Sequence, residues 1–159
     1  MSPNDLLLLN IDSAFEKSAW HGTTLRGALR GLTVEEALWR PAPDRKNIWE
    51  ELLHCAYWKY IACRRLVRDP PARFPRSPSD WPQPPGEPTP ELLRSDIALL
   101  REQHAALRAG VAAFPPSRLG LRPTKKGPTY AQLILGIAAH DLYHTGQIQL
   151  VKRLQGRSA

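Results

Sequence analysis

The sequence has few cysteines, and their spacing excludes a thiolate metal site. Only 2 of the 159 residues are cysteine, and Cys55 and Cys63 lack the Cys-x-x-Cys spacing that holds zinc or iron. If their segment is helical, the two residues lie about 12 Å apart along its axis, which is too far for a disulfide. We therefore interpret both thiols as packing residues in a reducing compartment.

Long apolar runs are also missing. No run approaches the roughly 20 apolar residues that span a bilayer, so no membrane partner is expected. The longest early run covers residues 6–9, and no basic segment precedes it, so a secretory signal is not expected either. We expect a cytoplasmic protein. The 42% hydrophobic and 23% charged residues suit one globular domain over residues 1–159.

The basic residues are numerous but form no run. The chain carries 22 Lys and Arg against 15 Asp and Glu, for a net charge of +7. Such an excess is typical of nucleic-acid-binding proteins. However, no five or six basic residues follow one another, and the densest groups are the pairs Arg64-Arg65 and Lys125-Lys126. We therefore do not expect a nucleic-acid partner, which would need the arginines gathered on one face.

Sustained alternation of apolar and polar residues is absent, and an all-α fold is predicted instead. Helix-capping residues before apolar stripes predict four main helices. They cover about residues 3–17, 47–68, 90–114 and 130–154. A helical pattern also covers residues 23–31 after the break at Trp20-His21-Gly22, and a short helix is predicted near residues 33–39.

Residues 69–90 contain nine prolines, which exclude a helix or a central strand. One reading is a disordered linker between two domains, but the flanking pieces are too short to fold separately. Phe74 and Trp81 can anchor the segment to the rest of the molecule. We therefore predict an ordered crossover between the second and third main helices, which lets those helices run parallel.

The last predicted helix carries the most informative pattern. Its core stripe reads Tyr130, Leu133, Ile137, His140, His144, Gln147, Val151 and Leu154. Three adjacent polar residues on a core stripe cost several kcal/mol unless they find partners. Histidines at i and i+4 share a helix face and can bind one metal ion. The alternative is a pair of core histidines that bond to neighbouring groups.

A third ligand would come from another helix, and the residue pattern leaves three candidates. His54 lies in the second main helix near Trp58, and it can face inward. His104 lies on the core stripe of the third main helix, where a hydrogen-bonded core histidine is the simpler reading. His21 lies at a helix break. Composition and spacing do not choose among these candidates.

The chain resembles the DinB superfamily, and within it the DinB-like branch of small bacterial proteins. The matching segments are Trp20-His21-Gly22, Ile48-Trp49-Glu50, Leu53-His54, Trp58, Asp80-Trp81-Pro82, Gly136, and the run from His140 to Ile148, HDLYHTGQI. The resemblance implies an up-down-down-up four-helix bundle, usually a homodimer. It also implies that His54, His140 and His144 hold a divalent metal. Zinc, nickel and iron all occur in relatives, so the resemblance does not identify the ion.

The resemblance also frames the function. Some relatives transfer low-molecular-weight thiols to electrophiles, and others are described as metal-dependent hydrolases. We expect an enzyme that activates water or a thiol toward a small-molecule substrate. The alternative is a non-catalytic metal- or ligand-binding protein of a stress response.

Several neighbours of the predicted triad are candidate catalytic residues. Gln147 can orient water or a ligand histidine, Tyr143 can donate a proton, and His21 can reach the mouth of the site. Asp141 points about 100° away from His140 around the helix, so a surface or supporting role is expected. Trp81 is a candidate for the pocket wall, whereas Trp49 and Trp58 are expected in the core.

Overall fold

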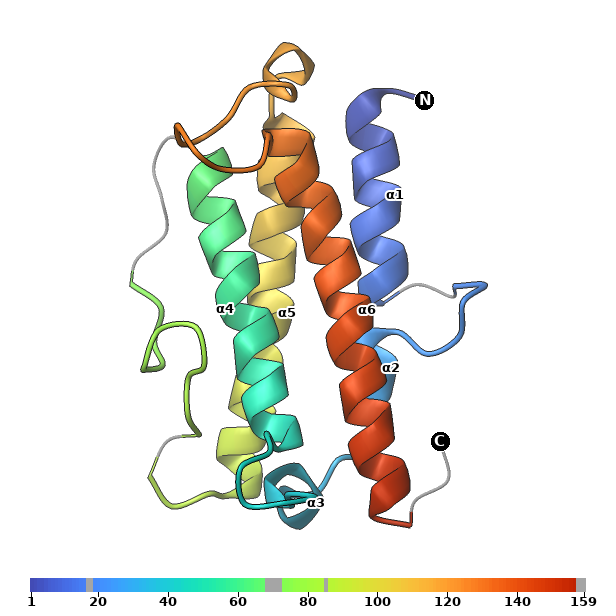
Figure 1. The fold of residues 1–159 in the computed structure, drawn as a ribbon, viewed down its shortest axis with the longest axis vertical. Coiled ribbons are helices and arrows are strands. Elements are labelled where there is room, and N and C mark those ends of the chain that lie inside the picture. Colours follow the sequence, from blue (N-terminus) through green and yellow to red (C-terminus); the bar gives the residue numbers. More distant parts are fainter. Residues whose placement is uncertain (17–18, 68–72, 85, 157–159) are drawn as a thin grey trace.

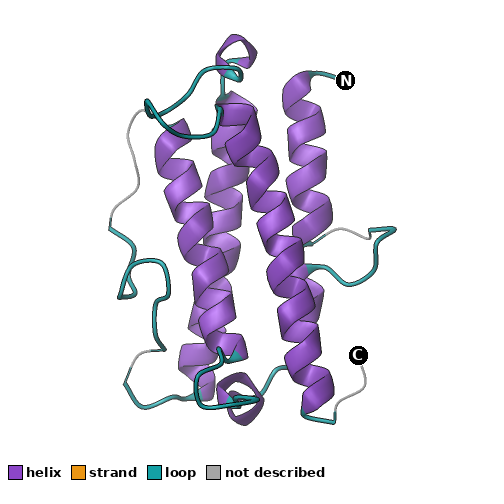
Figure 2. Cartoon of the chain, viewed as in Figure 1, coloured by secondary structure: helices purple, strands orange, loops and turns teal. Residues whose placement is uncertain are grey.

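The computed structural model describes residues 1–16, 19–67, 73–84 and 86–156, and all regular structure within them is helical (Figure 2). Four long helices form the body of the molecule: α1 (Pro3–Phe15), α4 (Ile48–Leu66), α5 (Pro90–Ala113) and α6 (Tyr130–Leu154). Three short ones are α2 (Leu25–Ala28), α3 (Val34–Leu38) and the 3₁₀ turn η1 (Pro116–Arg118). The predicted all-α class is confirmed.

The predicted helix starts are confirmed by their caps. Ser2, Asn47 and Thr129 each accept a hydrogen bond from a backbone N–H one turn into the helix, and a side chain at that position bonds back. Thr89 caps α5 by accepting a hydrogen bond from the backbone N–H of Leu92, with Pro90 in the first turn. These bonds satisfy backbone donors that have no partner inside the helix.

Some predicted ends were wrong. The helical pattern at residues 23–31 forms only the single turn of α2, with Gly31 in a left-handed conformation at φ 66°. The helix predicted over residues 47–68 ends at Leu66, and the one predicted to reach Lys17 ends at Phe15. Lys17 and Arg68 themselves lie outside the described residues.

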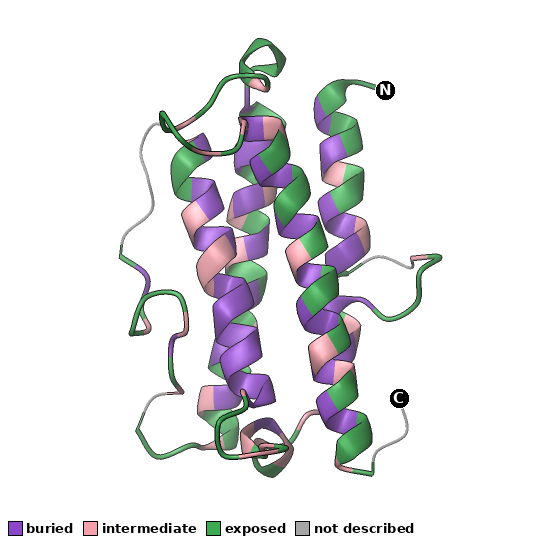
Figure 3. Cartoon of the chain, viewed as in Figure 1, coloured by how far each residue is buried: buried purple, intermediate pink, exposed green. Residues whose placement is uncertain are grey.

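The long helices pack side by side, and their buried apolar residues form two clusters (Figures 1 and 3). Helix α4 packs against α5 and α6, and α1 packs against α5 and α6. In Figure 1, α4 and α5 both begin at the end of the bundle where α3 lies, whereas α1 and α6 begin at the opposite end. Helices α4 and α6 are therefore neighbours, so side chains on their facing sides can meet. Within the described part of the chain, no helix is both long enough and apolar enough to cross a bilayer.

The proline-rich crossover runs along the outside of α4 (Figure 1). Phe74 is buried against the rings of Tyr57 and Tyr60, with ring centroids 5.5 and 5.4 Å away. Trp81 stacks on His54. The described part of the crossover is thus anchored by the two aromatic residues that the sequence singles out, although residues 68–72 and 85 lie outside the description.

Candidate metal centre

Three histidines meet between α4 and α6. His54 comes from α4, and His140 and His144 come from consecutive turns of α6. The Nε2 atom of His140 lies 3.1 Å from Nε2 of His54 and 3.1 Å from Nε2 of His144. Of the three candidates for the third ligand, the structure thus brings His54 to the α6 pair.

The partners of two rings fix where their lone pairs point. The Nδ1 atom of His54 lies 2.5 Å from the backbone carbonyl of Asp80, and a carbonyl oxygen can only accept. The Nδ1 atom of His144 bonds to the carboxylate of Glu51, which also accepts. Both rings therefore carry their proton on Nδ1. Their Nε2 lone pairs face His140 and each other.

This arrangement suits a cation. Three imidazoles bound to one zinc ion at 2.0–2.1 Å place their nitrogens roughly 2.9–3.4 Å apart, whether the geometry is tetrahedral or octahedral. The two 3.1 Å separations fall inside that range. A proton on His140 Nε2 satisfies only one of the two contacts, and the other then brings two lone pairs together. A metal ion at the centre satisfies all three nitrogens.

Burial favours the neutral form of His54 and His140, the form that binds a metal. Burial lowers the pKa of His54, although the Asp80 carbonyl partly opposes it. Burial, together with the neighbouring His144 and His54, lowers the pKa of His140 to about 3. Both rings are therefore unprotonated near neutral pH and can offer a lone pair to an ion.

The crossover forms one wall of the centre. The ring of Trp81 stacks on His54 at a centroid distance of 3.8 Å and an angle of 14°. The indole N–H of Trp58 donates to the Asp80 side chain at 2.8 Å, which holds the loop that presents the Asp80 carbonyl. Asp80 has a left-handed backbone at φ 70°, a conformation that Asp tolerates better than most residues. Trp58, which we predicted in the core, is partly buried against it and also supports the site through this bond.

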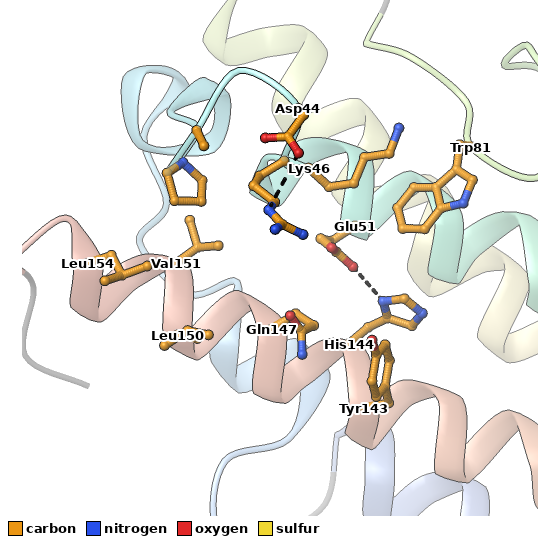
Figure 4. A pocket seen from close by; sticks show the side chains of 13 residues that line it. Asp44, Lys46, Glu51, Trp81, Tyr143, His144, Gln147, Leu150, Val151 and Leu154 are labelled. Carbon is orange, nitrogen blue, oxygen red and sulfur yellow. Dashed lines mark hydrogen bonds and ion pairs between the residues drawn. The ribbon is translucent and has the colours of Figure 1, made fainter.

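A cavity of about 510 Å³ adjoins His144 and leads from the metal centre toward the end of the bundle (Figure 4). Its walls differ in character. Leu150, Val151 and Leu154 give an apolar side, whereas Lys46 and Trp81 lie on the other side, with the amine 4.8 Å from the ring centroid. The cavity is large enough for a small organic molecule.

Two of the predicted catalytic residues line this cavity. Gln147 is half-buried one turn beyond His144, and the largely exposed ring of Tyr143 makes an edge contact with the His144 ring at 4.9 Å. His21 instead lines a separate hollow with Trp20 and residues of α1. Leu154, predicted as a core residue, is 56% exposed at the cavity rim.

His104 lies elsewhere in the core, as we expected for that residue. Its ring stacks on Phe15, and its Nε2 atom lies 3.3 Å from Asp12. Asp12, Glu16 and His104 form a second cluster of ligand-type atoms. Arg108 and Arg26 already pair with the two carboxylates of that cluster, so its charge is less suited to a cation than the histidine triad.

The sequence patterns did not predict the buried ion pair of Lys59 and Asp141. Asp141 is fully buried, so the surface position considered for it is wrong, and it bonds to the equally buried amine of Lys59. Burial raises the pKa of Asp141, and the positive charge of Lys59 opposes that shift. Burial also raises the pKa of the nearby Cys55 thiol well above its ordinary value, so this cysteine stays protonated.

The oxygen partners of the ligand rings were missed as well. Glu51 lies in the first turn of α4, where an acidic residue is usually explained by its favourable interaction with the helix dipole. Asp80 lies in the crossover. The three-residue spacing between Glu51 and His54 places both on one helix face, and that spacing was the one available signal. For Asp80 the sequence offered no local signal.

Comparison with known proteins agrees with this geometry. A family model described as the DinB superfamily matches residues 19–148, which include all three histidines of the triad. Searches of curated proteins and of solved structures returned no significant match. The match covers most of the chain and includes α4 and the part of α6 that carries His140 and His144. The chain belongs to the DinB superfamily.

Proposed function

We propose that this protein is a metal-dependent enzyme whose ion is held by His54, His140 and His144. The observation that carries the proposal is the convergence of three Nε2 atoms beside an open cavity. When bound there, a divalent metal lowers the pKa of water to about 7 or stabilises a thiolate. Zinc, nickel and iron are all compatible with imidazole ligands.

The ligand set supports an open coordination position rather than a structural site. Structural zinc sites are closed by four protein ligands. Among the described residues, the group of ligand-type atoms that contains all three triad histidines has no fourth member, and His140 belongs to a separate group with Cys55 and Asp141. The nearest carboxylate, that of Glu51, is bonded to Nδ1 of His144 on the outer side of the ring. A small molecule in the cavity can therefore approach the ion.

The residues around the cavity suit water or a low-molecular-weight thiol as the nucleophile. Gln147 has an amide that can orient a substrate beside His144, and Tyr143 has a phenol that can donate a proton to a leaving group. The apolar side at Leu150 and Val151 suits the carbon skeleton of an electrophilic substrate. His21 lies at another hollow, and its catalytic role stays a prediction.

A thiol-dependence assay tests the reaction class. Zinc- and nickel-loaded protein is incubated with a panel of esters and alkylating electrophiles, with and without a low-molecular-weight thiol. Turnover only with thiol identifies a transferase, and turnover without it identifies a hydrolase. Tyr143→Phe and Gln147→Leu are expected to lower turnover, whereas Leu121→Ala outside the cavity is not. Full metal loading with no turnover on any substrate would favour the non-catalytic binding protein.

We further propose a homodimer formed through the outer face of α1 and α6. The exposed large apolar residues on these two helices are Leu6, Leu9, Leu135, Leu142, Tyr143, Leu150 and Leu154. Between residues 130 and 151 of α6, the single acidic or basic residue is Asp141, which is buried. On a chain of net charge +7, this uncharged face lets two copies approach with the least repulsion. A second copy would also lie close to the cavity, because Tyr143 and Leu150 line it.

For each copy we propose the up-down-down-up helix order of the family. The course of the helices in Figure 1 supports this order.

A further inference from the structure

The ring of His140 lacks the oxygen acceptor at Nδ1 that the other two rings of the triad have. The Nδ1 atoms of His54 and His144 each bond to an oxygen. The Nδ1 atom of His140 is buried and has no hydrogen-bond partner among the described residues, and the same holds for one carboxylate oxygen of Asp141, Oδ1. Nδ1 of His140 can thus be a donor and Oδ1 of Asp141 an acceptor, and both atoms are buried without a hydrogen bond. Leaving them so lowers the stability of the fold unless a further group bonds to both.

The spacing fits one bridging water. A ring nitrogen of His140, a carboxylate oxygen of Asp141 and the sulfur of Cys55 all lie within 4.8 Å of one another. Because Nε2 of His140 faces the other two histidines, Nδ1 is the nitrogen free to face this group. Two polar atoms about 4–5 Å apart can each bond to the same water at about 2.8 Å. Three polar partners are the usual complement of a buried water.

Lys59 holds the carboxylate in place. Its amine bonds to Oδ2 of Asp141, and both side chains are 0% exposed. Burying two charges carries a desolvation cost, and an apolar pair of similar volume is often as stable or more so. Stability alone therefore does not account for this pair. The pair does orient Oδ1 of Asp141, which leaves that oxygen available to the neighbouring ring.

We propose that Asp141, held by Lys59, is a positioning residue for the metal ligand His140. One enclosed water accepts a hydrogen bond from Nδ1–H of His140 and donates one to Oδ1 of Asp141, so that the Nε2 lone pair of this ring faces the ion. All three ligands then share one design, in which an oxygen acceptor fixes the proton on Nδ1. Such partners orient ligand rings and raise their basicity. The inference rests on the metal site proposed above.

The test compares the wild type with the double variant Lys59→Met, Asp141→Leu. Replacing the whole pair avoids leaving one buried charge alone, so the double variant is expected to fold. Zinc affinity is measured by competition with a chelator, and the tautomer of His140 is read from proton–nitrogen NMR of the imidazole. The matched control is Arg76→Met, Asp96→Leu, which removes another buried carboxylate and its arginine; this carboxylate accepts a hydrogen bond from the indole of Trp49.

The expected result is a fall in zinc affinity of about 10–100-fold in the Lys59 and Asp141 double variant, with faster solvent exchange of the His140 Nδ1 proton. The Asp96 control is expected to keep wild-type zinc affinity and the wild-type His140 signal. Unchanged affinity and exchange in the double variant would overturn the positioning role, as would an equal loss in the control. A wild type that binds no zinc would instead refute the proposed function.

Discussion

At the residue scale, the direction of each ring matters more than the number of histidines. Five histidines are present, yet three of them approach one another closely from facing helices. The carbonyl of Asp80 and the carboxylate of Glu51 turn the Nε2 atoms of their partners toward His140. The same oxygens also restrict rotation of the rings, so the site is organised before an ion arrives.

Glu51→Gln tests this organisation. The amide is weaker as an acceptor than the carboxylate, so the His144 ring is held less firmly and is less basic. We expect zinc affinity to fall by about 10–100-fold while the helical content measured by circular dichroism is unchanged. Glu91→Gln, at the exposed start of α5, is the matched control and is expected to bind zinc normally. Equal affinity in Glu51→Gln and wild type would argue against this role.

His104 gives a pH prediction away from the metal. Burial, followed by the charge of Lys59, lowers its pKa to about 3, against about 6.5 in an unfolded chain. The unfolded state thus binds more protons than the folded state between these values. The stability associated with His104 is complete above about pH 6.5 and is lost as the pH falls toward about 3, by up to about 1.4 kcal/mol per pH unit.

His104→Gln removes this titration. Urea unfolding of the metal-free protein is measured across the same pH window for the variant and for the wild type. We expect the unfolding free energy of the wild type to fall more steeply with decreasing pH than that of the variant. His21→Gln, at an exposed position, should leave the slope as in the wild type. Parallel pH profiles for His104→Gln and wild type would contradict the account.

At the scale of the helices, local signals predicted where elements begin better than where they end. The caps at Asn47 and Thr129 were readable because their partners lie three residues away. The helical pattern at residues 23–31 was overestimated, because a left-handed Gly31 stops a segment that propensity alone would extend. The His140 and His144 pair was also local. The choice of His54 needed family resemblance, because it depends on which helices become neighbours.

Contacts between distant segments could not be predicted from the sequence. The Lys59–Asp141 pair joins residues 82 positions apart, and the Asp80 carbonyl reaches His54 from a loop without a local pattern. Both depend on how α4, α6 and the crossover pack. The general class of the crossover was predicted because its prolines exclude other structures. Its contact with the metal ligands was not predictable in that way.

Thr129→Ala tests the element that carries two ligands. Thr129 caps α6, and its loss leaves a backbone N–H without a partner, so we expect the free energy of unfolding to fall by about 0.5–2 kcal/mol. Because His140 lies about three turns away, zinc affinity is expected to stay near the wild-type value. Ser2→Ala at α1 is the comparison for an equivalent cap. A large loss of zinc affinity in Thr129→Ala would show that the site depends on the helix end.

At the scale of the whole molecule, charge is distributed unevenly. The chain is basic overall, yet the outer face of α6 is uncharged and carries Leu135, Leu142 and Leu150. Exposed apolar patches of this kind mark association surfaces. They are also close to the cavity, so the proposed dimer would affect access to the candidate metal centre.

Leu142→Lys tests the proposed dimer. A charge introduced on both copies at this face meets its own like charge across a two-fold axis, so we expect the variant to sediment as a monomer where the wild type is a dimer. Leu121→Lys, at an exposed residue outside the long helices, is the matched control and should remain dimeric. A monomeric wild type at micromolar concentration would remove the dimer from the account.

The most direct test of the central claim is the metal content of the purified protein. Metal-free protein is loaded with excess zinc, and the tightly bound fraction is quantified after gel filtration. We predict about one ion per chain in the wild type and in His104→Gln, because His104 lies outside the triad. We predict loss of the bound ion in His144→Ala. No bound zinc in the wild type, or equal zinc in wild type and His144→Ala, would contradict a metal site built from His54, His140 and His144.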